Sequence, residues 1–359
     1  MSMHPYKGLP SESFWKSGVS EKLWPEINFK ISTKFKMTQV DKIATGGSCF
    51  AQHIAKHLSS LGLSHYITEM PPKFLGQDRA SELNYGVFSA RYGNIYTVRQ
   101  LRDLIEFAFG WREPIILASQ TAGGWVDLLR PGVQAEPYQS LADLECDRIF
   151  HLDCVRKMWL EADVFIFTAG LTETWYDVNS GIMFPVCPGT KAGEYDPDAH
   201  KFKNFKTSEV LEDLNWCIQF IGTQNKNLKW IFTVSPVALS ATATNQHVLL
   251  ATTNAKSILR AAIDEICENY STCEYFPSYE ITLSAANFGQ FLDSDLRSIS
   301  PRGVNLVLRK FQSAFAFNSD ASIVLGKAAR SDVEERIRTA VKAECDEAFN
   351  DPRFGRGSS

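Results

Sequence analysis

Short runs of apolar or β-branched residues recur along the chain, and the stretches between them include helical patterns. The runs cover residues 42–45, 114–118, 163–168, 230–234 and 273–276. Runs of this length and spacing predict buried strands. Strands that alternate with helices indicate a mostly parallel sheet covered on both faces. The pattern therefore predicts an α/β protein with three layers, α/β/α.

The first of these runs ends in Gly46-Gly47-Ser48 and leads into a segment of helical period. The helical positions, followed by Gly62 as a C-cap, are Ala51, Ile54, Ala55, Leu58 and Leu61. A strand that ends in two glycines can turn sharply and present the next side chain at a helix N-terminus, where N–H groups favour an oxyanion. Ser48 is therefore a candidate nucleophile. The alternative is an ordinary strand-to-helix turn in which Ser48 is the N-cap.

Two further strand ends carry polar residues. Thr172 and Glu173 lie just beyond the third run, and Ser235 with Pro236 follows the fourth. Ligands of open α/β sheets bind beyond the carboxyl ends of the strands. We therefore expect these segments to converge on Ser48, although they are far apart in the sequence.

The chain is expected to form one dominant domain. We expect a surface segment at residues 1–35, the α/β domain at 36–327, and a helix with a frayed tail at 328–359. Residues 175–205 are rich in glycine, proline and aromatic side chains and lie between two core strands, which indicates an insertion or lid, or else a plain surface loop. A capping-box pattern begins the C-terminal helix at Ser331, and this helix is expected to dock on the domain or on a protein partner.

Composition narrows the class of protein. The chain has 359 residues, 44% hydrophobic and 22% charged, with a formal net charge of −4. The absence of a long basic run gives no support to a nucleic-acid partner. Eight cysteines without a C-x-x-C pair, in a sequence with no signal segment at its start, predict reduced thiols and a cytoplasmic location. No apolar run approaches the ~20 residues that a membrane span needs.

Residues 47–51 read Gly-Ser-Cys-Phe-Ala, and this string resembles the one that names the GSCFA family. Members of that family are similar to SGNH (GDSL-like) esterases and acyltransferases. Further segments that resemble the family lie, in chain order, at residues 4–7, 92–96, 170–175, 184–189, 233–237 and 275–280. The resemblance extends to about Gly303, and it implies an SGNH-hydrolase-like, flavodoxin-like fold.

The resemblance also implies roles for individual residues. Ser48 would be the nucleophile, and the Ser48 and Gly93 N–H groups would donate to the oxyanion, with Asn94 in the same block. Thr172 stands where SGNH enzymes have an asparagine, so it offers a hydroxyl in place of an amide donor. Glu173, in the family-like Leu-Thr-Glu pattern, would hold the base or satisfy buried N–H groups.

The chain departs from the SGNH pattern at the terminal Asp-x-x-His block. Asp295 matches the aspartate, but Ser298 occupies the histidine position, and a serine cannot act as a general base near neutral pH. We therefore assign Ser298 to the residues that bind the substrate or the oxyanion, and not to the catalytic base. His247, which follows the fourth strand end, is the best substitute for the base; the alternative is a solvated or structural histidine.

Two hypotheses follow from these residues. The first is a serine esterase or O-acyltransferase that acts on a small-molecule or carbohydrate ester, such as a polysaccharide precursor. The second is a binding or scaffold protein that keeps the fold but has lost its base. No metal or other cofactor is expected, because no third ligand accompanies the His53 and His57 pair.

Overall fold

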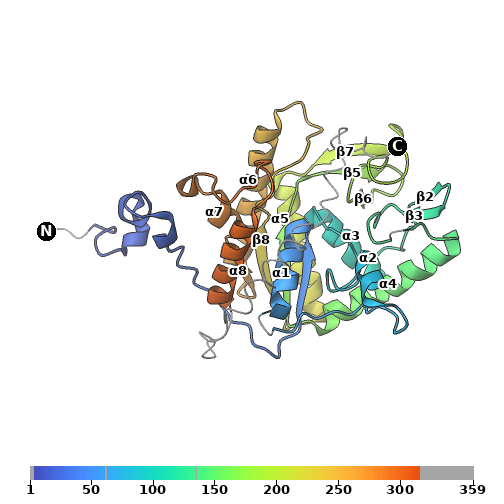
Figure 1. The fold of residues 1–359 in the computed structure, drawn as a ribbon, viewed down its shortest axis with the longest axis horizontal. Helices are drawn as coiled ribbons and strands as arrows, with labels where there is room; N and C mark the ends of the chain where they lie inside the picture. Colours follow the sequence, from blue (N-terminus) through green and yellow to red (C-terminus); the bar gives the residue numbers. More distant parts are fainter. Residues whose placement is uncertain (1–3, 61–62, 135, 316–359) are drawn as a thin grey trace.

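A parallel sheet of four strands forms the centre of the molecule (Figure 1). The computed structural model describes residues 4–60, 63–134 and 136–315. The strands are β1 (Ile43–Gly47), β4 (Val164–Ala169), β8 (Lys229–Val234) and β9 (Cys273–Tyr275), in the order β1-β4-β8-β9. On the other side of β1, an isolated parallel bridge joins Ile43 to His65, so the segment at His65 takes the place of a fifth strand at the edge of the sheet. The order then corresponds to the 2-1-3-4-5 order of flavodoxin-like sheets.

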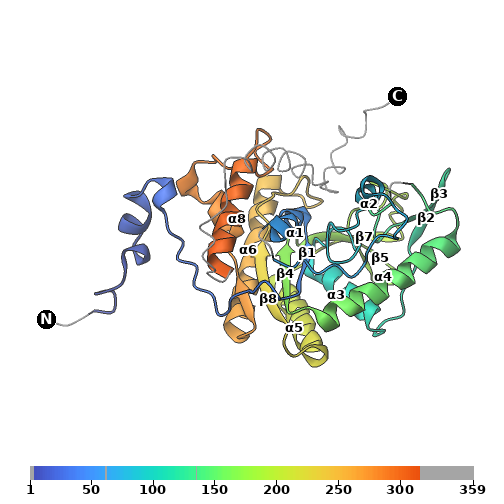
Figure 2. The same cartoon turned by 60° about the horizontal axis from the view of Figure 1, so that its bottom comes forward.

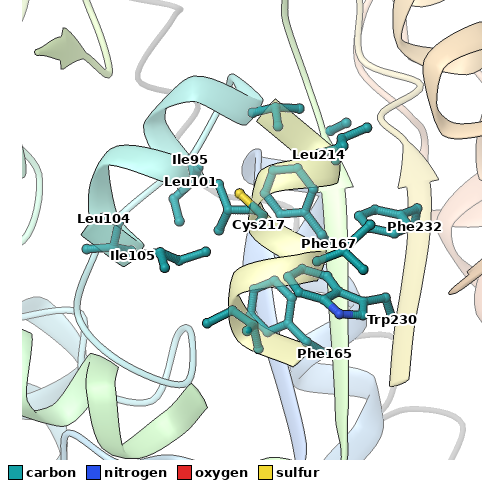
Figure 3. Close-up of a cluster of buried hydrophobic side chains, with 14 of the residues drawn as sticks. Ile95, Leu101, Leu104, Ile105, Phe165, Phe167, Leu214, Cys217, Trp230 and Phe232 are labelled. Atoms are coloured by element: carbon teal, nitrogen blue, oxygen red, sulfur yellow. The ribbon is translucent and has the colours of Figure 1, made fainter. Parts of the chain in front are cut away.

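Alternate residues of β4 face the two helical layers. Phe165 and Phe167 pack into one cluster, and Val164 and Ile166 into the other. Figure 3 shows Phe165 and Phe167 beside residues of the helices that cover their face. The helices of that layer are α3 (Val98–Ala108), α4 (Leu141–Glu161), α5 (Thr207–Gln224) and α6 (Val248–Asn269). The opposite layer contains α1 (Cys49–Ser60), α7 (Ser278–Leu283) and α8 (Pro301–Phe315). The predicted three-layer α/β/α fold is confirmed.

The run at residues 114–118 does not join the parallel sheet. It leads instead into β2 (Ala118–Thr121), which pairs antiparallel with β3 (Gly124–Asp127). Pro114 has no N–H to donate to a strand ladder, and residues 115–118 are only half-buried. A run of apolar residues was therefore insufficient to predict a central strand here.

Residues 173–204, which lie between β4 and β8 in the sequence, form a separate antiparallel sheet. Its strands are β5 (Glu173–Asp177), β6 (Met183–Phe184) and β7 (His200–Asn204), in the order β6-β5-β7. Trp175 on β5 contacts Phe202 and Tyr195, with ring centroids 5.6 and 5.2 Å apart. An ordered sheet with packed aromatic rings therefore occupies the region for which an insertion or lid, or else a plain surface loop, was expected.

The N-terminal segment lies on the side of the molecule that α7 and α8 form, in both views (Figures 1 and 2). It contains the short helices η1 (Ser11–Ser13), η2 (Lys16–Ser20) and η3 (Trp24–Glu26), and the rings of Trp24 and Phe291 lie 5.4 Å apart. The remaining short helices are α2 (Gln77–Glu82) and η4 (Ala285–Asn287). The helix and tail expected at 328–359 lie outside the described residues, and the division into three parts stays a prediction. None of the described helices has the length and hydropathy that crossing a membrane requires.

Candidate functional site

Ser48 occupies the sharp turn between β1 and α1. Gly47 has a φ of 129°, and a Cβ at this position would overlap the carbonyl of Thr168 on the neighbouring strand. Only glycine satisfies both conditions. The Ser48 N–H donates to the Thr168 carbonyl at 3.0 Å, and the Ser48 carbonyl accepts from Ala51 at 2.8 Å as α1 begins. Because the Ser48 N–H is already used, it is not the oxyanion donor that the sequence led us to expect.

The Ser48 hydroxyl is buried without a hydrogen bond. The residue is 2% exposed, and its Oγ has no partner in the described part of the chain. A serine that served as an ordinary N-cap would accept a bond from an N–H of the first helical turn. Leaving a buried hydroxyl unpaired costs about 1–3 kcal/mol. The Ser48 hydroxyl therefore does not act as an N-cap in this structure.

Gly170, just beyond β4, packs against Ser48. A Cβ at residue 170 would lie 2.9 Å from the Ser48 Cβ, so any larger side chain would displace the serine. The N–H groups of Gly170 and Leu171 both donate to the Tyr96 carbonyl, at 3.1 and 2.9 Å. The end of β4 and the segment before α3 are therefore locked together beside Ser48.

Residues 93–95 form the other side of this turn. Ile95 N–H donates to the Gly47 carbonyl at 2.8 Å, and Gly93 has a φ of 71°. The buried Asn94 side chain accepts from Gln52 Nε2 at 3.1 Å. Gln52 lies one helical turn after Ser48, so the structure brings Asn94 to the start of α1. The Gln52 contact was not anticipated, because a glutamine on an amphipathic helix has no distinctive spacing.

Beyond Gly170, Thr172 directly precedes β5, and Glu173 is the first residue of that strand. Thr172 is fully buried, and its Oγ1 has no partner among the described residues. The Glu173 carboxylate accepts from the Thr242 hydroxyl at 2.8 and 3.0 Å and from the Ala243 N–H at 3.2 Å. Burial raises the pKa of Glu173, although these donors act in the opposite direction. Glu173 thus holds the loop that follows β8 against the start of β5.

His247 is the N-cap of α6. Its Nδ1 accepts from the Leu249 N–H at 3.2 Å, and the side chain is exposed. Because the Ser48 Oγ has no partner, the structure does not bring His247 into hydrogen-bond contact with it.

Asp295 and Ser298 form a turn just before α8. Asp295 accepts from the Ser298 hydroxyl at 2.6 Å, from the Ser298 N–H at 2.8 Å and from the Arg297 N–H at 2.9 Å. Partial burial acts to raise the pKa of Asp295, but the hydrogen bonds from Ser298 and the backbone outweigh it and hold the pKa below its usual range. The carboxylate is therefore ionised at neutral pH.

The direction of α8 shows at which edge of the sheet the turn of Asp295 and Ser298 lies. Phe315, at the end of α8, accepts from the N–H of Met37, which precedes β1. The C-terminal end of α8 thus lies at the amino edge of the sheet, and its beginning lies at the carboxyl edge. Asp295 and Ser298 are therefore at the same edge as Ser48, but neither is bonded to its hydroxyl.

A buried lysine adjoins the Ser48 turn and was missed in the sequence. Lys256 on α6 is 1% exposed, and its Nζ donates to the Gly170 carbonyl at 2.7 Å. The signal was available, because Lys256 lies on the helix face of Ala255 and Leu259, both in hydrophobic clusters. A charged residue on such a face is rare unless it is paired.

The chain matches the sequence profile of a known protein family. The profile of the GSCFA family covers residues 42–311, which include every candidate residue described above. No curated protein sequence matches the chain.

Proposed function

Because the chain belongs to the GSCFA family, we propose that it is an SGNH-like serine esterase or O-acyltransferase. The observation that carries the proposal is the Ser48 hydroxyl, which is buried and unpaired at the start of α1 and at the carboxyl edge of the sheet. This is where flavodoxin-like sheets bind ligands. A hydroxyl that no neighbour engages is free to react once a substrate reaches it.

In the proposed reaction, Ser48 Oγ attacks the carbonyl carbon of an ester while its proton passes to a base. The tetrahedral oxyanion then expels the alcohol, which takes a proton, and leaves an acyl group on Ser48. Water or an acceptor alcohol removes that group in the second half of the reaction. The Gly93 N–H, the Thr172 hydroxyl and the positive end of α1 would stabilise the oxyanion, with Asn94 beside them.

We assign the base to His247 and its orientation to Asp295. The Thr242 hydroxyl, in the loop before His247, donates to Glu173 at the start of β5, and α6 follows this loop beyond the carboxyl end of β8. Ionised Asp295 lies at that edge with Ser298. Catalytic hydrogen bonds are often long before substrate binds, and we expect the contact between His247 and Ser48 to form in the complex. Carbohydrate esters stay the proposed substrate class.

The alternative is a binding or scaffold protein with the same fold. Two observations favour it: Ser298 replaces the histidine of the terminal block, and no base contacts Ser48 within residues 4–60, 63–134 and 136–315. In such a protein the unpaired hydroxyls of Ser48 and Thr172 would bind a polar ligand without reaction.

A fluorophosphonate probe distinguishes the two functions. If Ser48 is nucleophilic, it displaces fluoride from phosphorus, and the labelled peptide identifies residue 48. We expect labelling of the natural protein and of Ser313→Ala, a variant at an exposed serine of α8, and no labelling of Ser48→Ala. An inert Ser48 would favour the binding protein. A panel of aryl esters and acetylated sugars then measures turnover.

A further inference from the structure

We propose that Lys256 is a positioning residue for Ser48. It would fix the Gly170 peptide against the serine and would supply a positive charge behind the position where negative charge develops. This inference rests on the proposed acyl transfer and assigns Lys256 a role in it.

The burial of Lys256 is the first observation. An ammonium group removed from water costs several kilocalories per mole unless it is compensated. Lys256 lies on α6 between Ala255 and Leu259, and it is among the largest fully buried side chains of the described protein. An apolar residue would fill this position at lower cost. A charge retained at such a site therefore suggests a role other than packing.

The contact of Lys256 with Gly170 is the second observation. Its Nζ donates to the Gly170 carbonyl at 2.7 Å, while the Gly170 N–H donates to the Tyr96 carbonyl at 3.1 Å. The peptide groups on both sides of the Gly170 Cα are therefore fixed. Since Gly170 packs against the Ser48 Cβ, this arrangement restricts the space in which the serine side chain can lie.

The third observation is that the charge of Lys256 lies close to Ser48. The ammonium group and Ser48 both contact Gly170, and both residues are buried, where solvent screens charges poorly. A fixed positive charge in such a place stabilises an alkoxide or an oxyanion more than the neutral hydroxyl. Lys256 would therefore lower the pH at which Ser48 becomes reactive.

The experiment measures the rate of fluorophosphonate labelling at Ser48 between pH 5 and 10. Lys256→Met removes the donor and the charge at similar length, Lys256→Gln keeps an N–H donor without charge, and Lys256→Arg keeps both. Lys226→Met, at an exposed lysine before β8, is the control. Circular dichroism and the thermal midpoint establish that each variant is folded.

We expect Lys256→Met to label about tenfold more slowly or worse and to reach its half-maximal rate at higher pH. Lys256→Gln should show the same pH shift with a smaller loss, and Lys256→Arg should keep the pH profile of the natural protein. A uniform loss with an unchanged pH profile in every variant would show a merely structural lysine and overturn the inference. So would unchanged labelling of Lys256→Met. Failure of the natural protein to label at Ser48 would instead refute the proposed function, and this inference with it.

Discussion

Gly170 lies directly against Ser48, with room for no side chain between them. A Cβ at residue 170 would come 2.9 Å from the Ser48 Cβ and 3.3 Å from the Tyr96 carbonyl oxygen. The two residues are more than 120 positions apart and meet because β1 and β4 are neighbouring parallel strands. The position of the serine side chain therefore depends on a glycine from another strand end.

Substitution of Gly170 by alanine should misplace Ser48. We expect about a 10²-fold loss of Ser48 labelling, because a displacement of about 1 Å can have this effect on a reacting group. Overpacking should also lower the free energy of unfolding by about 1–3 kcal/mol. The control is Gly222→Ala in α5, where a Cβ meets nothing within 4 Å and alanine should stabilise the helix by up to about 1 kcal/mol. Equal labelling of the two variants would contradict the prediction.

The two possible roles of His247 can be separated by asparagine. Asparagine is a good N-cap but cannot accept a proton, so His247→Asn should keep the stability of α6 within a few tenths of a kcal/mol. As the proposed base, His247 should contribute a factor of about 10²–10⁴ to turnover. Ester hydrolysis and urea unfolding measure the two effects. Unchanged turnover would reduce His247 to a cap, and Glu173→Gln would then test the buried carboxylate as the base.

Histidine at position 298 should increase the reactivity of Ser48. The Ser298 hydroxyl donates to Asp295 at 2.6 Å, and an imidazole N–H at this position can donate to the same carboxylate. The other ring nitrogen would then be a base at the carboxyl edge of the sheet. We expect Ser298→His to label at least about tenfold faster than Ser298→Ala above pH 7. If Ser298→His labels no faster than Ser298→Ala, a side chain at residue 298 does not come within hydrogen-bond distance of Ser48, and the prediction is wrong.

Stability should depend on pH through Asp103. Burial raises the pKa of this α3 carboxyl to about 7, although the Met183 N–H and Arg112 act in the opposite direction. Between about pH 4 and 7 the folded protein then binds more protons than the unfolded chain. The contribution of Asp103 to the free energy of unfolding should thus fall as pH rises, by up to about 1.4 kcal/mol per pH unit. Asp103→Asn should lack this fall; parallel pH curves for the two proteins would contradict the assignment.

The sequence determined four strands of the central sheet, the helix after Ser48 and the family. Predicted runs at 163–168 and 230–234 became β4 and β8 with shifts of a single residue, and the helical period after Ser48 became α1. These predictions succeeded because the spacing of apolar residues within one segment indicates which of its faces is buried. The family string at 47–51 and the serine at position 298 can likewise be recognised from a few neighbouring residues.

Only the tertiary structure decided the contacts between elements. It assigned the Ser48 N–H to the Thr168 carbonyl, placed Gly170 against the serine and brought Lys256 to the Gly170 carbonyl. Each of these contacts depends on which strands are neighbours and which helix covers them. The period of one segment carries no information about a partner a hundred residues away, so strand order and helix packing had to supply the geometry around Ser48.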